Sequence, residues 1–275
     1  MEAELQAKVA RLRELIAGYG RVAVAFSGGV DSSLLLAFCV DVLGPERVVA
    51  LTADSPLLPR AELAMAQRIA KLLGAQHRIV PFDDLAIPEV AANPPRRCYH
   101  CKRARFEALL ALLRETEGAQ LLHGENADDH LDYRPGSLAA QELGIPAPLA
   151  LAGLGKAEIR TLARERGLPN WDYPSAACLA SRFPYGTPLT REGLERVEKA
   201  ETRVQELLQR RQVRVRDHFP LARIEVAPEE VVRVASPELR PAISAALHEL
   251  GYRFVTVDLD GYRMGSLNDG ITTTR

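Results

Sequence analysis

Apolar positions in the first half of the chain follow two spacings. Short apolar runs are typical of buried strands, and apolar residues every three or four positions are typical of helices. The runs predict strands at Val22–Phe26, Val48–Leu51, Arg78–Phe82 and from Leu121, and the helical spacing occurs at 3–17, 34–43, 57–73 and after Cys98. We expect the third helix to turn inward Leu63, Ile69, Leu72 and Leu73. Strands that alternate with helices predict an α/β fold, a doubly wound parallel sheet covered on both faces.

The pattern changes after a cluster of chain breakers at Pro184, Gly186 and Pro188. We therefore place a domain boundary there, with residues 1–186 in the first domain and 187–275 in the second. A charged helical stretch, 192–211, follows, and then short alternating strands at Val213–Arg216, Arg223–Val226 and Phe254–Val257, with helices predicted at Pro228–Val234 and Leu239–Leu250. This order predicts a small α+β domain with one covered sheet face.

A serine- and glycine-rich loop joins the first strand to its helix. Glycines let a ligand approach the backbone, and the free N–H groups of a helix N-terminus attract anions. Its spacing disfavours both the dinucleotide-binding fingerprint and the Walker loop, and an ordinary Gly-Gly turn with a helix cap is the plain alternative. The loop resembles the PP-loop of the ATP pyrophosphatase superfamily, which splits ATP into AMP and pyrophosphate. That resemblance implies a pyrophosphate cradle of Ser27, Gly28, Gly29, Asp31, Ser32 and Ser33.

The ends of the second and fourth strands carry further candidates, because ligands of parallel sheets collect at the carboxyl ends of the strands. Ala50, Leu51 and Thr52 are candidates to hold adenine through main-chain groups. Asn126 and Asp128 follow the fourth strand, where phosphates and Mg²⁺ are expected, although a solvated acidic turn is equally consistent. Lys156 either reaches the phosphates or is a solvated lysine at a helix start.

The cysteines form a second set of candidates. Cys98 and Cys101 share one face at the start of a helix, and the basic residues around them favour thiolates. Cys178 lies in a distant loop, and Cys39 is interpreted as a small core residue. Three thiolates on a 4Fe-4S cluster would leave one iron open to a sulfide or a substrate atom. A redox dithiol with an unrelated Cys178, or a zinc site, remains an alternative.

Arg214 and Arg216 alternate on a predicted strand, so both should face one side about 6–7 Å apart. Guanidinium groups suit phosphate and carboxylate ligands, and a solvated strand face is the alternative. Arg182 and Glu201 are weaker candidates for the same substrate site. Trp171 could stack on a cationic ring, but we favour its interpretation as a loop anchor.

Several stretches together resemble the LarE family, the sulfur transferase that builds the nickel-pincer nucleotide cofactor of lactate racemase. They are Ser27–Ser33, Arg97–Lys102, Glu125–Arg134, Pro174–Arg182, Arg214–His218 and Asp260–Ser266. The resemblance implies that ATP, with Mg²⁺, adenylates one carboxylate of a pyridinium biscarboxylic acid mononucleotide, and that sulfur then displaces AMP to give a thiocarboxylate. It also suggests that Arg214 and Arg216 hold the phosphate of that nucleotide.

The family divides by the source of its sulfur. Some members have only the cysteine that matches Cys178 and sacrifice its sulfur, whereas three-cysteine members are thought to hold a 4Fe-4S cluster. Because this chain has Cys98, Cys101 and Cys178, the resemblance predicts the cluster type, with all three as metal ligands and catalytic residues, and sacrifice of the Cys178 sulfur as the alternative.

Composition and net charge limit which partners and which rival functions are expected. The net charge of −1 does not indicate a nucleic-acid surface, which disfavours the main rival, a PP-loop tRNA thiolase. A non-catalytic nucleotide-binding module with a structural zinc is a second rival. With no run long enough to span a membrane and no signal peptide, a cytoplasmic protein is expected. The family resemblance further suggests a homo-oligomer, a sulfide or other sulfur donor, and contact with other enzymes of the nickel-pincer pathway.

Overall fold

The chain folds into two compact units. The computed structural model describes residues 2–114, 118–131, 135–174, 177–263 and 265. The first unit comprises Met1–Asp83 and Arg96–Ala176, and the second comprises Asp84–Pro95 and Ala177–Arg275. Parts of the stretches that resemble the LarE family, at 132–134, 175–176, 264 and 266, lie outside the described residues.

This division differs from the boundary expected at residue 186. The segment 84–95 belongs to the second unit because it bonds to the segment after 184. The Gly186 amide donates to the Asn93 carbonyl at 2.9 Å, and the Leu189 amide donates to the Ala91 carbonyl at 2.8 Å. Such bonds join residues about ninety positions apart, so local chain breakers could not reveal them.

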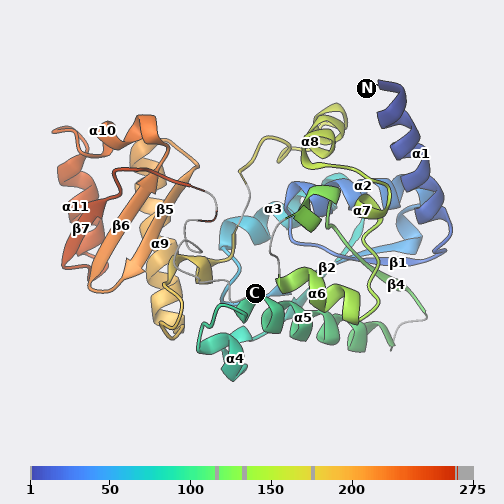
Figure 1. Cartoon of the computed structure of the whole chain (residues 1–275), viewed down its shortest axis with the longest axis horizontal. Helices are drawn as coiled ribbons and strands as arrows, with labels where there is room; N and C mark the ends of the chain where they lie inside the picture. The colour runs from blue at the N-terminus through green and yellow to red at the C-terminus, as the bar shows by residue number, and fades with distance from the viewer. Residues whose placement is uncertain (1, 115–117, 132–134, 175–176, 264, 266–275) are drawn as a thin grey trace. The chain divides into compact units, whose positions relative to one another are not determined.

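The first unit is a parallel α/β domain (Figure 1). Its strands run in the order β3-β2-β1-β4, and every pairing is parallel. The predicted fold class is therefore confirmed. The helices and strands of this unit are α1 (Glu2–Ala17), β1 (Val22–Ala25), α2 (Val30–Leu43), β2 (Val48–Asp54), α3 (Arg60–Leu72), β3 (Gln76–Pro81), α5 (Arg97–Arg114), β4 (Gln120–His123), α6 (Pro135–Glu142), α7 (Pro148–Leu151) and α8 (Lys156–Glu165).

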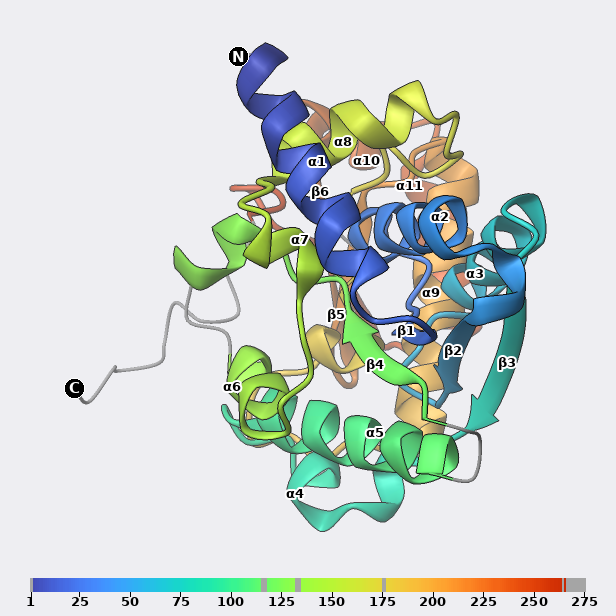
Figure 2. The ribbon, with the colours of Figure 1, turned by 90° about the vertical axis from the view of Figure 1, so that its right-hand side faces the viewer.

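Helices cover both faces of this sheet, as the apolar strand runs predict. Val22 and Val24 of β1 pack into one apolar cluster with α1, α2, α3 and α8, whereas Ala23 packs into another with α5 and α6. The two helical layers lie on opposite sides of the strands in both ribbon views (Figures 1 and 2). Alternate side chains of one strand thus pack into the cores on the two faces of the sheet. Because helices cover both faces, the strand ends are where a ligand can reach the sheet.

Two local expectations are corrected. In α3 the buried positions are Ala66, Ile69 and Ala70, and Leu72 is 60% exposed, so its predicted inward position is wrong. Small alanines allow α3 to lie close to the sheet, which a search for large apolar residues overlooks. The polar residues around Gly136 suggest a loop from the sequence, but helix α6 begins at Pro135.

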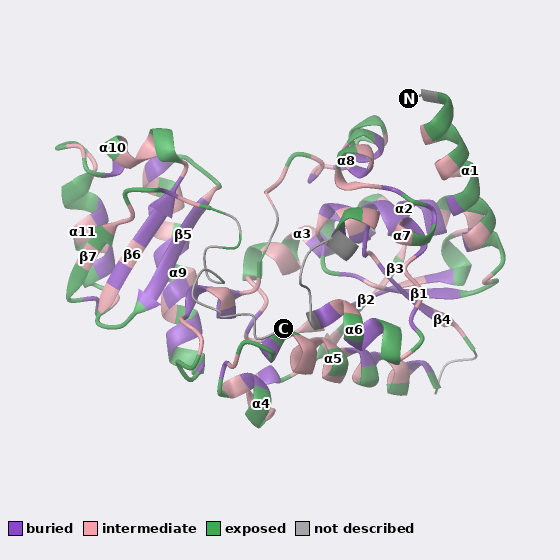
Figure 3. Cartoon of the chain, viewed as in Figure 1, coloured by how far each residue is buried: buried purple, intermediate pink, exposed green. Residues whose placement is uncertain are grey.

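The second unit is an α+β domain with one apolar sheet face. Strands β5 (Val213–His218) and β6 (Leu221–Val226) are antiparallel, and β7 (Phe254–Val257) is parallel to β6. Val213, Val215 and Ile224 pack with helices α9 (Arg191–Leu208) and α11 (Arg240–His248), and β5 and β6 are mostly buried (Figure 3). The remaining helices are α4 (Pro88–Ala91) and α10 (Val231–Val234), with the 3-10 turns η2 (Asp84–Ala86), η4 (Leu179–Arg182) and η5 (Pro228–Glu230). No helix in the described part of the chain is long and apolar enough to cross a membrane.

Candidate functional site

The glycine loop after β1 is closed by its own hydroxyl groups. Gly29 caps α2, and the Ser32 and Ser33 hydroxyls donate to its carbonyl at 3.1 and 2.9 Å. Gly28 has φ +79°, and a Cβ there would lie 3.0 Å from the Ala66 nitrogen and the Glu62 oxygen. Glycine at this position therefore lets the loop adopt a left-handed turn directly against α3. Amides at a helix N-terminus attract anions, and binding of pyrophosphate at the start of α2 stays a prediction.

An ion-pair network joins three distant segments at this loop. The Lys156 amino group, at the start of α8, lies 2.8 Å from both carboxylate oxygens of Asp31 in α2. The Asn126 side-chain amide, after β4, donates to the same carboxylate at 3.3 Å. Asp31, Asn126 and Lys156 thus meet beside the loop. Lys156 is paired with Asp31 there, and its contact with phosphates stays a prediction. A carboxylate and an amine here suit a divalent cation and phosphate respectively.

Two other predicted residues, Asp128 and Thr52, bond to the backbone of segments next to this site. The Asp128 carboxylate accepts from the Lys156 backbone amide at 2.7 Å and so helps to start α8. The Thr52 hydroxyl is buried, donates to the Phe26 carbonyl at 2.7 Å and lies 2.8 Å from His77 Nε2. Burial lowers the pKa of His77. The side chains of Asp128 and Thr52 therefore hold neighbouring segments in place.

The cysteines belong to different units. Cys98 is exposed and Cys101 half-buried near the start of α5 in the first unit. Arg97 donates to the Cys98 sulfur at 3.6 Å. Cys178 is half-buried and precedes η4 in the second unit. Cys39 is fully buried in the core, and burial raises the pKa of its thiol to about 12, which agrees with a packing role.

The thiols fit an iron–sulfur cluster in kind, since cluster ligands are cysteine thiolates. Within the described residues, no group of three or more His, Cys, Asp and Glu side chains is placed to hold a metal ion. Cys98 and Cys101 are one helical turn apart, which suits two ligands of one cluster.

The four predicted substrate residues gather in the second unit. Arg182 in η4 donates through Nε and Nη2 to the two oxygens of Glu201 in α9, both at 2.8 Å. Arg182 also donates to the backbone carbonyls of Ala177 and Cys178, at 2.6 and 3.0 Å. Arg182 and Glu201 are both buried, and the Val215 amide donates to the same Glu201 carboxylate. Arg182 therefore holds the backbone around Cys178.

Arg216 is paired in the same manner. Its Nε and Nη2 donate to Glu225 in β6 at 2.9 and 2.6 Å, and its Nη1 donates to the Ser181 carbonyl at 2.7 Å. Glu225, 1% exposed, was missed by the sequence analysis. Its role depends on the register of β5 and β6, which places it opposite Arg214. The signal in the sequence was an acidic residue, Glu225, on the strand that follows the one with Arg214 and Arg216. Recognising it as their partner requires the register of the two strands, which the sequence alone does not give.

Arg214 differs from its two neighbours. Its guanidinium donates to the Val213 carbonyl and lies 5.4 Å from the centre of the Tyr262 ring. Burial, and then the positive charge of Arg182, lowers the pKa of Arg214. An anion bound beside Arg214 would offset that repulsion, and a phosphate contact of this side chain stays a prediction.

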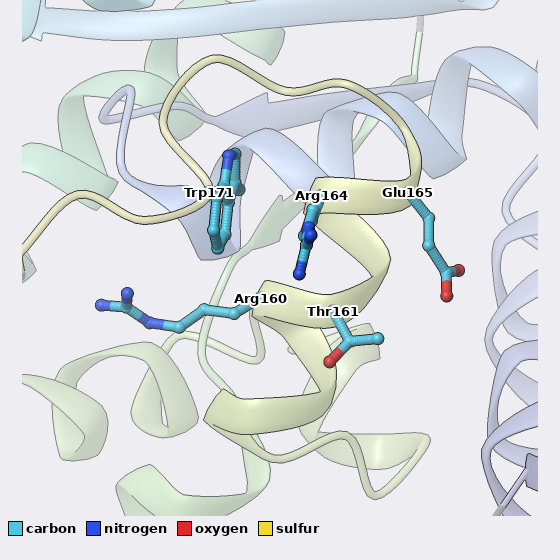
Figure 4. Close-up of a pocket in the computed structure, with 5 residues that line it drawn as sticks. All are labelled: Arg160, Thr161, Arg164, Glu165 and Trp171. Atoms are coloured by element: carbon cyan, nitrogen blue, oxygen red, sulfur yellow. The ribbon is translucent and has the colours of Figure 1, made fainter.

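A separate hollow of about 400 Å³ lies beside α8, lined by Arg160, Thr161, Arg164, Glu165 and Trp171 (Figure 4). The Arg164 guanidinium lies 5.2 Å from the Trp171 ring, and Trp171 packs against the core of the first unit. Arg160 donates to the Tyr173 carbonyl at 2.9 Å. These contacts agree with the interpretation of Trp171 as a loop anchor.

The fold and the loop define a class of protein. A parallel α/β domain with Ser-Gly-Gly-Val-Asp-Ser between its first strand and helix is a PP-loop domain, and the NAD synthase family matches residues 4–94. A relative from Lactiplantibacillus plantarum, pyridinium-3,5-bisthiocarboxylic acid mononucleotide synthase, is 36% identical over 270 residues, which cover 98% of this chain and 97% of its own. The chain belongs to the family of that synthase, as its resemblance to the LarE family predicts.

Two further relatives extend over most of the chain. An uncharacterized protein of Synechocystis sp. is 40% identical over 268 residues, or 98% of this chain and 99% of its own. An uncharacterized protein of Methanocaldococcus jannaschii is 26% identical over 245 residues, or 88% of this chain and 91% of its own. The similarity therefore spans both units and is not confined to the nucleotide loop.

Proposed function

We propose that the protein is an ATP-dependent sulfur transferase that converts a carboxylate of pyridinium-3,5-biscarboxylic acid mononucleotide into a thiocarboxylate. The observation that carries this proposal is the identity of 36% to the bisthiocarboxylic acid mononucleotide synthase over nearly the whole of both chains. The geometry of both units supports it, because charged residues meet beside the glycine loop in the first unit and buried arginines gather in the second.

The first unit binds ATP and activates the substrate carboxylate. In the proposed reaction a substrate carboxylate attacks the α-phosphorus of ATP, the bond to the β-phosphate oxygen breaks, and pyrophosphate leaves into the Ser27–Ser33 loop. Asp31 is the carboxylate that suits Mg²⁺, an oxygen-seeking cation, and Lys156 is the cation that suits the phosphates. Asn126 orients Asp31, and Asp128 orients the start of α8. The main chain near Thr52 is the proposed place of adenine.

The second unit binds the substrate. Three buried arginines, Arg182, Arg214 and Arg216, lie in this unit, where Arg182 pairs with the buried Glu201 and Arg216 with the buried Glu225. We assign the mononucleotide phosphate first to Arg214. Arg216 lies on the same side of the strand, and Arg182 with Glu201 holds the backbone of Cys178 in place.

Sulfur is delivered through the cysteines. Cys98, Cys101 and Cys178 are the thiolates that would hold a 4Fe-4S cluster, which would present a sulfide to the acyl-adenylate. In the alternative, the Cys178 sulfur attacks the acyl carbon and AMP leaves. Loss of the Cα proton then breaks the Cβ–S bond, so the thiocarboxylate departs and dehydroalanine remains at position 178. Either route replaces one carboxylate oxygen with sulfur.

The test of the function is pyrophosphate release from ATP on addition of the pyridinium biscarboxylate mononucleotide. We expect release that depends on this substrate, and release with every carboxylate or with none would contradict the proposal. A nucleotide-binding module would bind ATP without release, and a tRNA thiolase would retain tRNA on a filter at physiological salt.

The sulfur route has a separate test. Anaerobic purification, followed by iron and sulfide analysis, should find a cluster that is lost on Cys98→Ser. A colourless, iron-free protein whose Cys178 loses the mass of H₂S during turnover would assign it to the sacrificial route. The homo-oligomer, a sulfur donor and the other pathway enzymes as partners remain predictions, and size-exclusion chromatography with light scattering tests the first.

A further inference from the structure

A buried amide from a distant segment holds the glycine loop. Asn170 lies after α8 and is 1% exposed. Its Nδ2 donates to the Gly28 carbonyl at 2.7 Å and contacts the Ser33 hydroxyl at 3.0 Å. A carbonyl can only accept, so the Gly28 contact fixes which end of the amide faces the loop. No residue in the described part of the chain donates to the Asn170 Oδ1 atom, which is buried. The hydrogen bonds of the Asn170 side chain described here therefore all go from its Nδ2 to the loop.

This contact determines the direction of one backbone amide. In a trans peptide, the carbonyl of one residue and the N–H of the next point in opposite directions. Because Asn170 holds the Gly28 carbonyl on its own side, the Gly29 N–H points away from Asn170. Among the described residues, that N–H makes one hydrogen bond, a long contact of 3.3 Å to the Ser27 hydroxyl. It is therefore a donor that a stronger acceptor could take over.

Within the described residues, the loop itself holds this peptide through the 3.3 Å contact of the Gly29 N–H with the Ser27 hydroxyl. The Ser32 and Ser33 hydroxyls bond to the carbonyl of Gly29, one residue further along. Gly28 itself, with φ +79°, has the conformational freedom of a glycine. A peptide flanked by two glycines rotates at little cost unless a side chain holds it, and Asn170 provides that restraint.

We propose that Asn170 is a positioning residue, which holds the Gly28–Gly29 peptide so that the Gly29 N–H faces the β- and γ-phosphates of ATP. The proposal rests on the function proposed for the loop. Asn170 itself does not touch the nucleotide and acts through the peptide that it orients.

The informative substitution is Asn170→Asp, which keeps the shape but replaces the donating nitrogen with an oxygen. A carboxylate facing the Gly28 carbonyl repels it, so the peptide should turn. Asn170→Ala, which removes the donor without adding charge, is measured beside it. Asp172→Asn is the matched control, because Asp172 is an exposed residue of the same segment.

The experiment measures the Kd of the full chain for Mg·ATP and for AMP by titration calorimetry, together with the Tm of each variant. We expect both Asn170 variants to bind Mg·ATP at least about tenfold more weakly, the size of one or two lost hydrogen bonds. AMP, which lacks the β- and γ-phosphates, should bind as tightly as it does to the wild type. The control should match the wild type for both ligands.

Three results would overturn the proposal. Mg·ATP affinities that equal the wild type in both variants would remove the role of Asn170 and leave the nucleotide site intact. Losses of Mg·ATP and AMP affinity that are equal and follow Tm would indicate a purely structural contact. A wild-type chain that binds no Mg·ATP would overturn the proposed nucleotide site itself, and with it this role.

Discussion

The two units contain candidate anion sites of different construction. In the first unit the glycine loop uses backbone amides and small hydroxyls, and its nearby charges, Asp31 and Lys156, neutralise each other. In the second unit, buried arginines are held by buried glutamates. Backbone donors follow from the conformation of one short segment, whereas buried charges need partners from elsewhere in the fold. The first site should therefore be sensitive to backbone shape and the second to charge balance.

The largest expected effect is the loss of one partner from a buried pair. Arg182→Ala leaves the Glu201 carboxylate buried without its bidentate partner, and we expect a destabilisation of about 3–5 kcal/mol. Urea unfolding measures it. The double variant Arg182→Met/Glu201→Leu should recover much of the lost stability, because neither charge of the pair is then buried without its partner.

Arg203→Ala is the control for that comparison. Arg203 and Glu249 form an exposed pair, which should contribute about 1 kcal/mol or less. Equal losses in the Arg182 and Arg203 variants would contradict the view that burial makes the second site sensitive to charge balance.

The next effect separates the two sites by ligand. Arg214→Ala should raise the KM for the mononucleotide substrate by about ten- to a hundredfold, the size of a charge-assisted hydrogen bond, and leave the Kd for ATP unchanged. Lys156→Ala should weaken ATP and leave substrate binding unchanged. Steady-state kinetics measures the KM for the mononucleotide in both variants, and calorimetry measures their Kd for ATP. A variant that weakens the binding of both ligands equally would contradict the assignment of ATP to the first unit and of the mononucleotide to the second.

Backbone shape is tested at two glycines with similar φ angles. Gly28→Ala should cost about 1–2 kcal/mol for the left-handed conformation, and the contacts at 3.0 Å with α3 should add to this and weaken ATP binding. Gly20 has φ +73°, and a Cβ added there would have nothing within 4 Å, so Gly20→Ala should show the conformational cost alone. Thermal unfolding and ATP titration of both variants check this, and identical behaviour would show that close approach to α3 is unimportant.

The smallest effect concerns pH. Because burial lowers the pKa of His77 in the folded state, the unfolded chain binds its proton first as the pH falls. The contribution of His77 to stability should therefore be lost as the pH falls through the ordinary range of histidine, near 6.5. Urea unfolding at pH 7.5 and 5.5 should show a smaller decrease for His77→Gln than for the wild type. A decrease of the same size in both would rule out this linkage.

The sequence by itself was sufficient for the features that are local. The strands of the parallel sheet, the loop at Ser27–Ser33 and the shared side of Arg214 and Arg216 all follow from spacing along a few residues. Hydrophobic periodicity and glycine conformations act over one or two turns of chain, so they are visible in the sequence. The family, too, could be recognised from its short motifs.

The tertiary structure decided which of these residues act together. The contacts of Lys156 with Asp31, of Asn170 with Gly28 and of Arg182 with Glu201 join separate segments, and Glu225 faces Arg216 only through the strand register. The transfer of 84–95 to the second unit has the same origin. A buried polar group must find a partner, but the chain can bring that partner from any distance, so the sequence shows the need without showing which residue meets it.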